Sequence, residues 1–300
     1  MISLLKRLSK AIKACLNASL YILNLLLCSL LLYIVAVIKV VYRTKKGRQM
    51  FERIGYNVAK FYAFINDKII SLTSNIIWEI DDTSHLSKNE WYLLLSNHQN
   101  WMDIVILEKV FVRKIPMLKF FVKKELLWVP LVGTSCWVLN FPFMKRYSKA
   151  FLDKNPHLRG QDLETTRKAC AMFQMIPTTL INFAEGTRVS PEKQKKTHSP
   201  FKHLLKPKAG GAAFSIAAMN GMLKTLIDVT IIYHTDNATA WNFLCGNIPK
   251  VTVTFKVKPI TSDLMGDYQN DEHFRAHFQD WLNTLWAEKD NLIEQRRIDK

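Results

Sequence analysis

A histidine and an aspartate stand five residues apart where an apolar run ends. The segment reads SNHQNWMD over residues 96–103, and His98 and Asp103 are its two titratable side chains. A carboxylate that holds an imidazole fixes the tautomer and orientation of the ring, which makes it a general base. Such a base can take a proton from a hydroxyl group that attacks an activated acyl group. The spacing alone is weak evidence, because a lone histidine is more often satisfied by polar loop neighbours.

The elements around this pair decide whether it can form. Trp91–Ser96 has the pattern of a buried strand, and Met102–Val110 has helical spacing. On one continuous helix, residues five apart point about 140° away from each other. A bend at Gln99–Trp101 instead returns the carboxylate to the imidazole. It also places Asp103 in the first turn of a helix, where negative charge is favourable.

Two further polar segments follow apolar runs. FAEGTR, residues 183–188, follows the expected strand Thr179–Phe183. Its glycine allows a ligand to approach the backbone closely, and its arginine offers a planar set of donors that suits phosphate. Upstream, FPFMKR ends another strand-like apolar run with Lys145 and Arg146. Because ligands bind where the strands of an α/β sheet end, the three segments predict one shared site.

These segments resemble the sequence blocks of the glycerophospholipid acyltransferase family, which includes 1-acylglycerol-3-phosphate acyltransferases. NHQNWMD matches the first block, the N-H-x4-D motif; FPFMKR is similar to the second; FAEGTR matches the third, usually F-P-E-G-T-R. The fourth block, an apolar run with a proline, falls at Val229–Thr235. Block order and spacing hold over residues 85–260. Strings such as ELLWVPLVG and THSPFKHLLKPKAGG look most similar to short bacterial YihG-type acyltransferases.

The chain departs from the family pattern at two positions. Ala184 stands where the third block usually has proline, and the charged residues of that block stay intact. Tyr233 stands where the proline of the fourth block is expected. In the family this block is linked to the substrate pocket, so the departure bears on substrate preference more than on activity.

The resemblance implies a role for each matching residue. His98 is expected to be the general base that deprotonates the acceptor hydroxyl, and Asp103 to orient and stabilise the imidazolium. The family transfers the acyl group directly from acyl-CoA or acyl carrier protein, without an acyl-enzyme, a metal or another cofactor. The other matching positions are expected to bind the acceptor, with the arginines on its phosphate and the glutamate in the least defined role: Arg146, Glu185, Gly186, Thr187 and Arg188.

The resemblance further implies a membrane-bound enzyme that acts on lysophospholipids. The first candidate acceptor is 1-acylglycerol-3-phosphate, which would give phosphatidic acid. Another lysophospholipid, such as lysophosphatidylglycerol, stays open because of the altered fourth block. The expected location is a bacterial inner (cytoplasmic) membrane with the site on the cytoplasmic side, where thioester donors occur. A non-enzymatic membrane-anchored lipid-binding protein is the alternative from another class.

The first 80 residues are expected to attach the chain to a membrane. Leu20–Ile38 is uncharged and long enough for a transmembrane helix, and it lacks the cleavage site of a signal peptide. Basic residues on both flanks leave its orientation open, and a helix that dips into the cytoplasmic leaflet would satisfy both. Residues 51–76 then place apolar side chains three and four apart. This spacing is typical of an amphipathic helix that lies at the membrane interface or packs on the domain.

Composition sets the wider bounds. The chain has 300 residues, a net charge of +17 and five cysteines without a C-x-x-C pair, which argues against a zinc knuckle or a disulfide framework. The basic excess predicts an anionic partner such as anionic membrane lipids or a phosphorylated substrate, and no nucleic-acid motif accompanies it. We expect an α/β fold with a mixed sheet flanked by helices. Residues 1–80 would form the N-terminal membrane-anchoring helical segment, and residues 81–300 the catalytic domain with its C-terminal helix.

Two other kinds of site have weaker support. Ser96 precedes His98 by two residues, but the segment lacks the glycines of the G-x-S-x-G turn of serine hydrolases. His273 and His277 are four apart on an expected helix, without the glutamate that zinc proteases place after the first histidine. Neither pattern predicts a second reaction.

Overall fold

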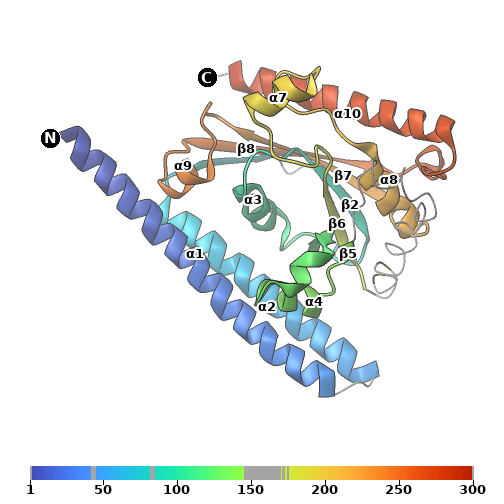
Figure 1. The fold of residues 1–300 in the computed structure, drawn as a ribbon, viewed down its shortest axis with the longest axis horizontal. Coiled ribbons are helices and arrows are strands. Elements are labelled where there is room, and N and C mark those ends of the chain that lie inside the picture. The colour runs from blue at the N-terminus through green and yellow to red at the C-terminus, as the bar shows by residue number, and fades with distance from the viewer. Residues whose placement is uncertain are drawn as a thin grey trace.

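A six-stranded mixed sheet with helices on both faces forms the centre of the chain (Figure 1). It is seen in a computed structural model, which describes residues 2–41, 45–81, 85–144, 170, 173 and 176–298. This arrangement confirms the predicted α/β class with a mixed sheet flanked by helices and an N-terminal helical segment.

Strands and helices are interspersed along the chain after the first two helices. The strands are β1 (Ile77–Asp81), β2 (Tyr92–Ser96), β3 (Leu118–Phe120), β4 (Val122–Lys123), β5 (Phe143–Met144), β6 (Thr179–Phe183), β7 (Thr225–Tyr233) and β8 (Lys250–Pro259). The helices are α1 (Ile2–Val41), α2 (Lys45–Thr73), α3 (Met102–Phe111), α4 (Val132–Val138), α7 (Pro191–Thr197), α8 (Ala209–Ala218), α9 (Ala240–Leu244) and α10 (Glu272–Ile298), with the short 3-10 helices η1 (Lys124–Trp128) and η4 (Ser262–Leu264).

The strand order brings the ends of distant sequence segments together. The sheet runs β1-β8-β7-β2-β6-β3, and β7, β2, β6 and β3 are parallel to one another. β8 is antiparallel to β7, and β1 is parallel to β8. Because β1 starts at Ile77, the sheet includes residues before position 81, where the catalytic domain was expected to begin. In the register of β2 and β6, Ser96 lies opposite Phe183. The first and third sequence blocks therefore leave the sheet side by side.

Alternation along the strands supplies two apolar faces. In β2, Tyr92 and Leu94 face the layer that contains α3, whereas Leu93 and Leu95 face α8 and α10. All four side chains are buried, as expected for a central parallel strand covered on both sides. Burial of these faces fixes the register, because a slip of one residue would exchange the two sets.

The apolar run before FPFMKR differs from its prediction as a strand. Val132–Val138 forms α4, and only Phe143–Met144 is extended. These two residues pair with Val122–Lys123 in a separate two-stranded sheet. The prediction is wrong because periodicity does not distinguish a short apolar strand from a short buried helix.

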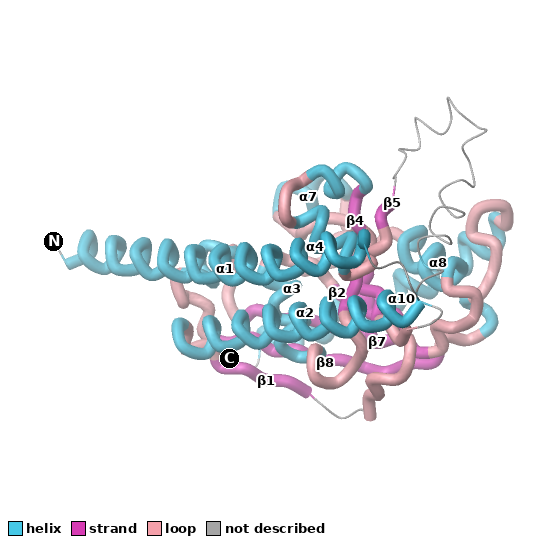
Figure 2. Tube along the Cα trace, turned by 90° about the horizontal axis from the view of Figure 1, so that it is seen from below, coloured by secondary structure: helices cyan, strands magenta, loops and turns pink. Residues whose placement is uncertain are grey.

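The N-terminal helices α1 and α2 lie side by side along one edge of the molecule (Figures 1 and 2). Their contact includes a buried hydrogen bond from Asn24 Nδ2 to Asn66 Oδ1, 2.8 Å long. Near its start, α1 is joined to α9 by Asn17 Nδ2, which donates to the Leu244 carbonyl at 2.7 Å. Near its end, Lys39 Nζ donates to the Val138 carbonyl of α4 at 3.4 Å. The helix is thus attached to the rest of the fold along its length.

The outer face of α1 is apolar. Most of its leucines and isoleucines between Leu8 and Ile38 are exposed, whereas Leu32 is buried. Within the described ranges, Arg7–Val40 is the one helical stretch long and apolar enough to cross a membrane, by length and composition. The predicted run Leu20–Ile38 is therefore part of a longer helix.

Candidate active site

The histidine and aspartate of the first block lie against each other in the turn between β2 and α3. His98 Nδ1 is 2.8 Å from Asp103 Oδ2. The aspartate side chain is fully buried, whereas 17% of the histidine side chain is exposed. Beside an ionised carboxylate, Nδ1 carries the hydrogen and donates it, which leaves a lone pair on Nε2. Over the residues that the structure describes, Nε2 has no hydrogen-bond partner. This geometry is compatible with a general base.

Further donors hold the Asp103 carboxylate. The backbone N–H groups of Gln99 and Asn100 donate to Oδ2 at 2.6 and 3.0 Å. The Tyr233 hydroxyl donates to Oδ1 at 2.7 Å. Asp103 is also in the first turn of α3, where the helix dipole favours its charge. This is the bend that the sequence predicted between strand and helix.

An aromatic ring supports the imidazole from the neighbouring strand. The Phe183 ring, at the end of β6, stacks on His98 with a centroid distance of 4.1 Å and an interplanar angle of 21°. Phe183 and Ser96 are register partners, so the sheet sets this contact directly. The imidazole is held on one side by a carboxylate and on its face by an apolar ring.

Glu185, from the third block, binds the backbone of the first. Its Oε1 accepts the His98 N–H at 3.0 Å, and its Oε2 accepts the Leu205 N–H at 2.9 Å. The side chain is buried, and burial raises the pKa of Glu185 to about 7 although the two backbone donors lower it. Both oxygens are engaged within the protein. The structure therefore places this glutamate where it positions His98.

A second main-chain contact joins the two blocks. The Val189 N–H donates to the His98 carbonyl at 2.9 Å, so both backbone polar groups of His98 are bound to the third-block turn. That turn closes with the Gly186 N–H on the Phe183 carbonyl at 2.9 Å. Gly186 has φ of +72°, a left-handed conformation that favours glycine.

The remaining third-block side chains face the same turn. Lys193 Nζ donates to Thr187 Oγ1 at 2.7 Å and to the Arg188 carbonyl at 2.9 Å. The Arg188 guanidinium lies 4.7 Å from the centre of the Trp101 ring, and Trp101 is 64% exposed. Arg188 has no carboxylate partner among the residues placed by the structure. Its N–H groups are thus free to bind an anion.

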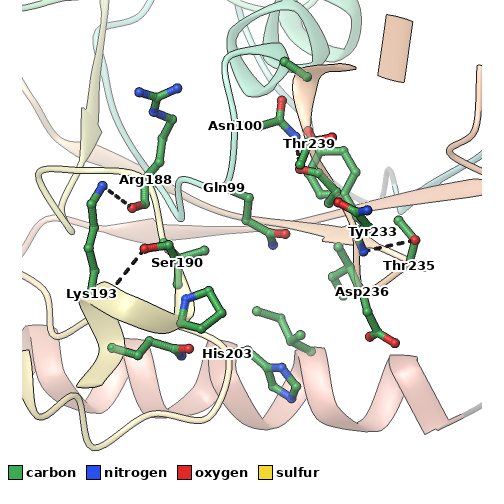
Figure 3. A pocket seen from close by; sticks show the side chains of 18 of the residues that line it. Gln99, Asn100, Arg188, Ser190, Lys193, His203, Tyr233, Thr235, Asp236 and Thr239 are labelled. Carbon is green, nitrogen blue, oxygen red and sulfur yellow. Dashed lines mark hydrogen bonds between the residues drawn. The ribbon is translucent and has the colours of Figure 1, made fainter. Parts of the chain in front are cut away.

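A pocket of about 700 Å³ lies beside these turns. Figure 3 shows Arg188 and Lys193 on one side of it and the segment from the end of β7 onward on the other, with Gln99 between them. Its lining includes the cationic side chains Arg188, Lys193, Lys202 and Arg297, together with His203, and Asp236 is the acidic member. The pocket therefore favours an anionic group next to the histidine turn.

The structure brings together most residues predicted for the site. One cluster at the ends of β2 and β6 contains His98, Asp103, Glu185, Gly186, Thr187 and Arg188. Arg146 lies outside the described residues.

The other sites considered from the sequence receive no support. The Ser96 hydroxyl is buried and donates to the Asn97 carbonyl at 3.0 Å. His277 lies 3.4 Å from an Asp263 oxygen. Over the ranges placed by the structure, no group of three or more His, Cys, Asp and Glu residues could hold a metal ion.

Two contributors to the site were not predicted. Tyr233 was noted in the sequence only as a departure from the fourth block, yet its hydroxyl reaches Asp103. Asn97 is fully buried, and its side-chain amide both donates to the Ile231 carbonyl and accepts the Ile231 N–H, each at 2.9 Å. Its place inside the N-H-x4-D motif was the available signal, but its partner depends on the strand order.

Comparison with known proteins yields relatives of one kind. The chain is 27% identical over 259 residues to 2-acyl-1-lysophosphatidylinositol acyltransferase from Saccharomyces cerevisiae, covering 71% of this chain and 62% of that protein. It is 25% identical over 187 residues to 1-acyl-sn-glycerol-3-phosphate acyltransferase gamma from Mus musculus, covering 59% and 45%. The chain thus spans less than two thirds of the length of these relatives.

A solved structure and a family model also match. The 1-acyl-sn-glycerophosphate (LPA) acyltransferase PlsC from Thermotoga maritima is 18% identical, with a TM-score of 0.41, over 90% of this chain and 97% of that one. The family model described as Acyltransferase matches residues 78–234, just over half of the chain, and this range includes both turns that hold His98. The chain belongs to the acyltransferase family.

Proposed function

We propose that the protein transfers a fatty acyl group from an acyl thioester to the hydroxyl group of a lysophospholipid. The observation that carries this proposal is the His98 imidazole, whose Nδ1 is bound to buried Asp103 while its Nε2 is unengaged within the described chain. In the third-block turn that binds the backbone of His98, Arg188 presents N–H groups that have no carboxylate partner among the described residues. A base next to an anion-binding group suits a hydroxyl acceptor that carries a phosphate.

In the proposed reaction, His98 first accepts a proton and later returns it. His98 Nε2 takes the proton of the acceptor hydroxyl as the oxygen attacks the thioester carbonyl. The new C–O bond forms, the tetrahedral intermediate collapses, and the C–S bond breaks. The thiolate then takes the proton back from the imidazolium and leaves as a thiol. Asp103 stabilises the positive ring between these two steps.

Binding of the acceptor rests on the third block. Arg188, supported on Trp101, is the proposed phosphate ligand, and the family resemblance adds Arg146. Lys193 holds the Thr187 and Arg188 segment in place, and Gly186 leaves its backbone accessible. Glu185 acts in this scheme as a positioning residue for His98.

The acceptor is proposed to be 1-acylglycerol-3-phosphate, which gives phosphatidic acid. The name of the mouse relative supports this choice. The yeast relative is named for a lysophosphatidylinositol, so that acceptor is the second candidate, beside lysophosphatidylglycerol. Acyl-CoA and acyl carrier protein are both candidate donors, and no metal or cofactor is required by the mechanism.

The chain is further proposed to work at a membrane. The exposed leucines of α1 supply an apolar surface, and the net charge of +17 favours anionic lipids. In the bacterial setting predicted from the YihG-type resemblance, this is the inner membrane, with the site on the cytoplasmic side. Attachment of α1 to α9 and α4 supports a helix that stays with the domain and dips into one leaflet.

The test is acyl transfer by the full chain in vesicles. A labelled acyl-CoA and a labelled acyl carrier protein are each offered with lysophosphatidic acid, lysophosphatidylinositol and lysophosphatidylglycerol. His98→Ala is expected to lower the rate about 10²–10⁴-fold. His273→Ala, at an exposed histidine of α10, is the matched control and keeps the wild-type rate.

The outcomes separate the alternatives. Transfer to another lysophospholipid alone keeps the mechanism and changes the acceptor. Vesicle binding without transfer to any acceptor from either donor would favour the non-enzymatic lipid-binding protein. Equal rates for wild type and His98→Ala would remove His98 from the mechanism.

A further inference from the structure

The Asp103 carboxylate has an unequal set of partners. Oδ2 accepts three hydrogen bonds, from His98 Nδ1 and from two backbone N–H groups. Oδ1 accepts a single hydrogen bond in the part of the chain that is described, from the Tyr233 hydroxyl at 2.7 Å. Removal of that hydroxyl would leave a buried, charged oxygen without a donor, which is costly in a site of low dielectric constant.

The sheet places Tyr233 over the start of α3. Ser96, the last residue of β2, pairs with Val229, so β7 continues four residues beyond the end of its neighbour. Val229, Ile231 and Tyr233 alternate onto the face that packs on α3. Tyr233 is 1% exposed, and its contact with Asp103 joins residues 130 positions apart. The last residue of the overhang therefore reaches the carboxylate.

The phenol is held in its donating form. Burial and the nearby Asp103 charge raise the pKa of Tyr233 well above its ordinary value. The hydroxyl keeps its proton at neutral pH and donates it to Oδ1.

We infer that Tyr233 is a positioning residue for acyl transfer, which fixes the rotation of the Asp103 carboxylate and so aims Oδ2 at His98 Nδ1. The inference rests on the proposed function of His98 as the base. A carboxylate held at both oxygens cannot turn away as the imidazolium forms, so the hydroxyl acts on the transition state rather than on substrate binding. Tyr233, which replaces the expected proline of the fourth block, would thus have a role in orienting Asp103.

The first test compares two buried tyrosines. Tyr233→Phe removes the hydroxyl on Asp103, and Tyr92→Phe removes one that accepts the Ser87 N–H at 2.8 Å in the same core. For Tyr233→Phe, kcat is expected to fall roughly ten- to a hundredfold with KM unchanged. For Tyr92→Phe, both constants are expected to stay within about twofold of wild type. Equal losses of kcat in the two variants would overturn the inference.

A double variant tests the route through Asp103. In the Asp103→Asn background, Tyr233→Phe is expected to cause no further loss, because the carboxylate that it orients is gone. A further loss equal to that in the wild-type background would overturn the inference. If the wild-type chain transfers no acyl group, both this inference and the proposed function are overturned. If the chain is active but Tyr233→Phe and Tyr92→Phe have the same kcat, only this inference is overturned.

Fluorotyrosines test the hydroxyl of Tyr233 without removing it. Incorporated at position 233, mono-, di- and trifluorotyrosine retain the ring and the hydroxyl but change its strength as a donor. A monotonic change of kcat along the series, without a change at position 92, would support the inference. A constant kcat at position 233 would overturn it, even if Tyr233→Phe fails to fold.

Discussion

At the scale of single residues, His98 is fixed through every polar group except the one proposed to react. Its N–H binds Glu185, its carbonyl binds Val189, and its Nδ1 binds Asp103. Phe183 stacks on the ring. These contacts limit rotation of the ring and the peptide, so the Nε2 lone pair keeps a constant direction. Preorganisation of this kind contributes to catalysis without a direct contact with substrate.

Glu185 gives a prediction for stability against pH. Its pKa is about 7 in the folded chain and 4.5 for the free side chain. Between these values the folded chain holds a proton that the unfolded chain has released, so its contribution to the free energy of unfolding falls as pH rises from 4.5 to 7. The full change is roughly 3 kcal/mol.

Urea unfolding of wild type and Glu185→Gln measures this contribution. The glutamine cannot titrate, so the difference in unfolding free energy between the two proteins should shrink between about pH 4.5 and about pH 8. A difference that stays constant would mean that Glu185 is ionised throughout. At the upper end of this range, where Glu185 is ionised in both states, the variant should still be destabilised by about 1–3 kcal/mol, because its amide NH₂ faces one of two backbone N–H groups.

At the scale of elements, the parts near the motifs were predictable and the contacts between them were not. The strands β2 and β6 and the helix α3 follow from apolar runs that end in polar residues. The α4 segment was misread because a short run carries no periodicity that separates helix from strand. The Tyr233–Asp103 contact depends on β7 lying beside β2 and extending past it, which is a property of strand order rather than of local sequence. For the same reason, the backbone role of Glu185 was not visible in FAEGTR.

The helix α10, which contacts β7 through Lys289, gives a second prediction. On α10, Lys289 forms a buried ion pair with Asp228 and donates to the Val229 carbonyl at 2.5 Å. Lys289→Met leaves the Asp228 charge buried and unpaired, and should cost about 3–5 kcal/mol of unfolding free energy.

The matched control is a more exposed ion pair, which joins α10 to the neighbouring strand β8. Lys258→Met breaks the half-exposed contact with Glu288 and should cost less than about 1 kcal/mol. The double variant Asp228→Leu, Lys289→Met should recover most of the lost stability, because no charge is then left unpaired. Equal effects of the two lysine substitutions would show that burial does not govern the Lys289 pair.

At the scale of the whole molecule, the largest set of exposed apolar side chains in the described residues lies on one helix. α1 exposes leucines on its outer face and is held by α9 near its start and by α4 near its end. Passage of this helix across a bilayer, away from the domain, would break one of these contacts. We therefore expect both ends of α1 to lie on the same side of the membrane.

Cysteine labelling tests this arrangement. Ser9→Cys in α1 and Met50→Cys in α2 lie on either side of the apolar run Leu20–Ile38, in a Cys15→Ser background that removes the exposed native thiol. A membrane-impermeant maleimide should label both new cysteines from the same side of sealed vesicles and neither from the opposite side. Labelling of the two positions from opposite sides would establish a spanning helix.

The overhang of β7 beyond β2 has a consequence for reading mutational scans of this chain. Where β2 stops, the Asn97 side chain takes the place of a peptide unit, with one donor and one acceptor aligned on Ile231. Aspartate at this position would set an acceptor against a carbonyl, leucine would leave both backbone groups unpaired, and glutamine would be one methylene too long. Position 97 should therefore tolerate as few amino acids as the neighbouring histidine. In this turn, a position that tolerates few substitutions can therefore hold either a reacting side chain or a side chain that replaces a backbone hydrogen-bonding group.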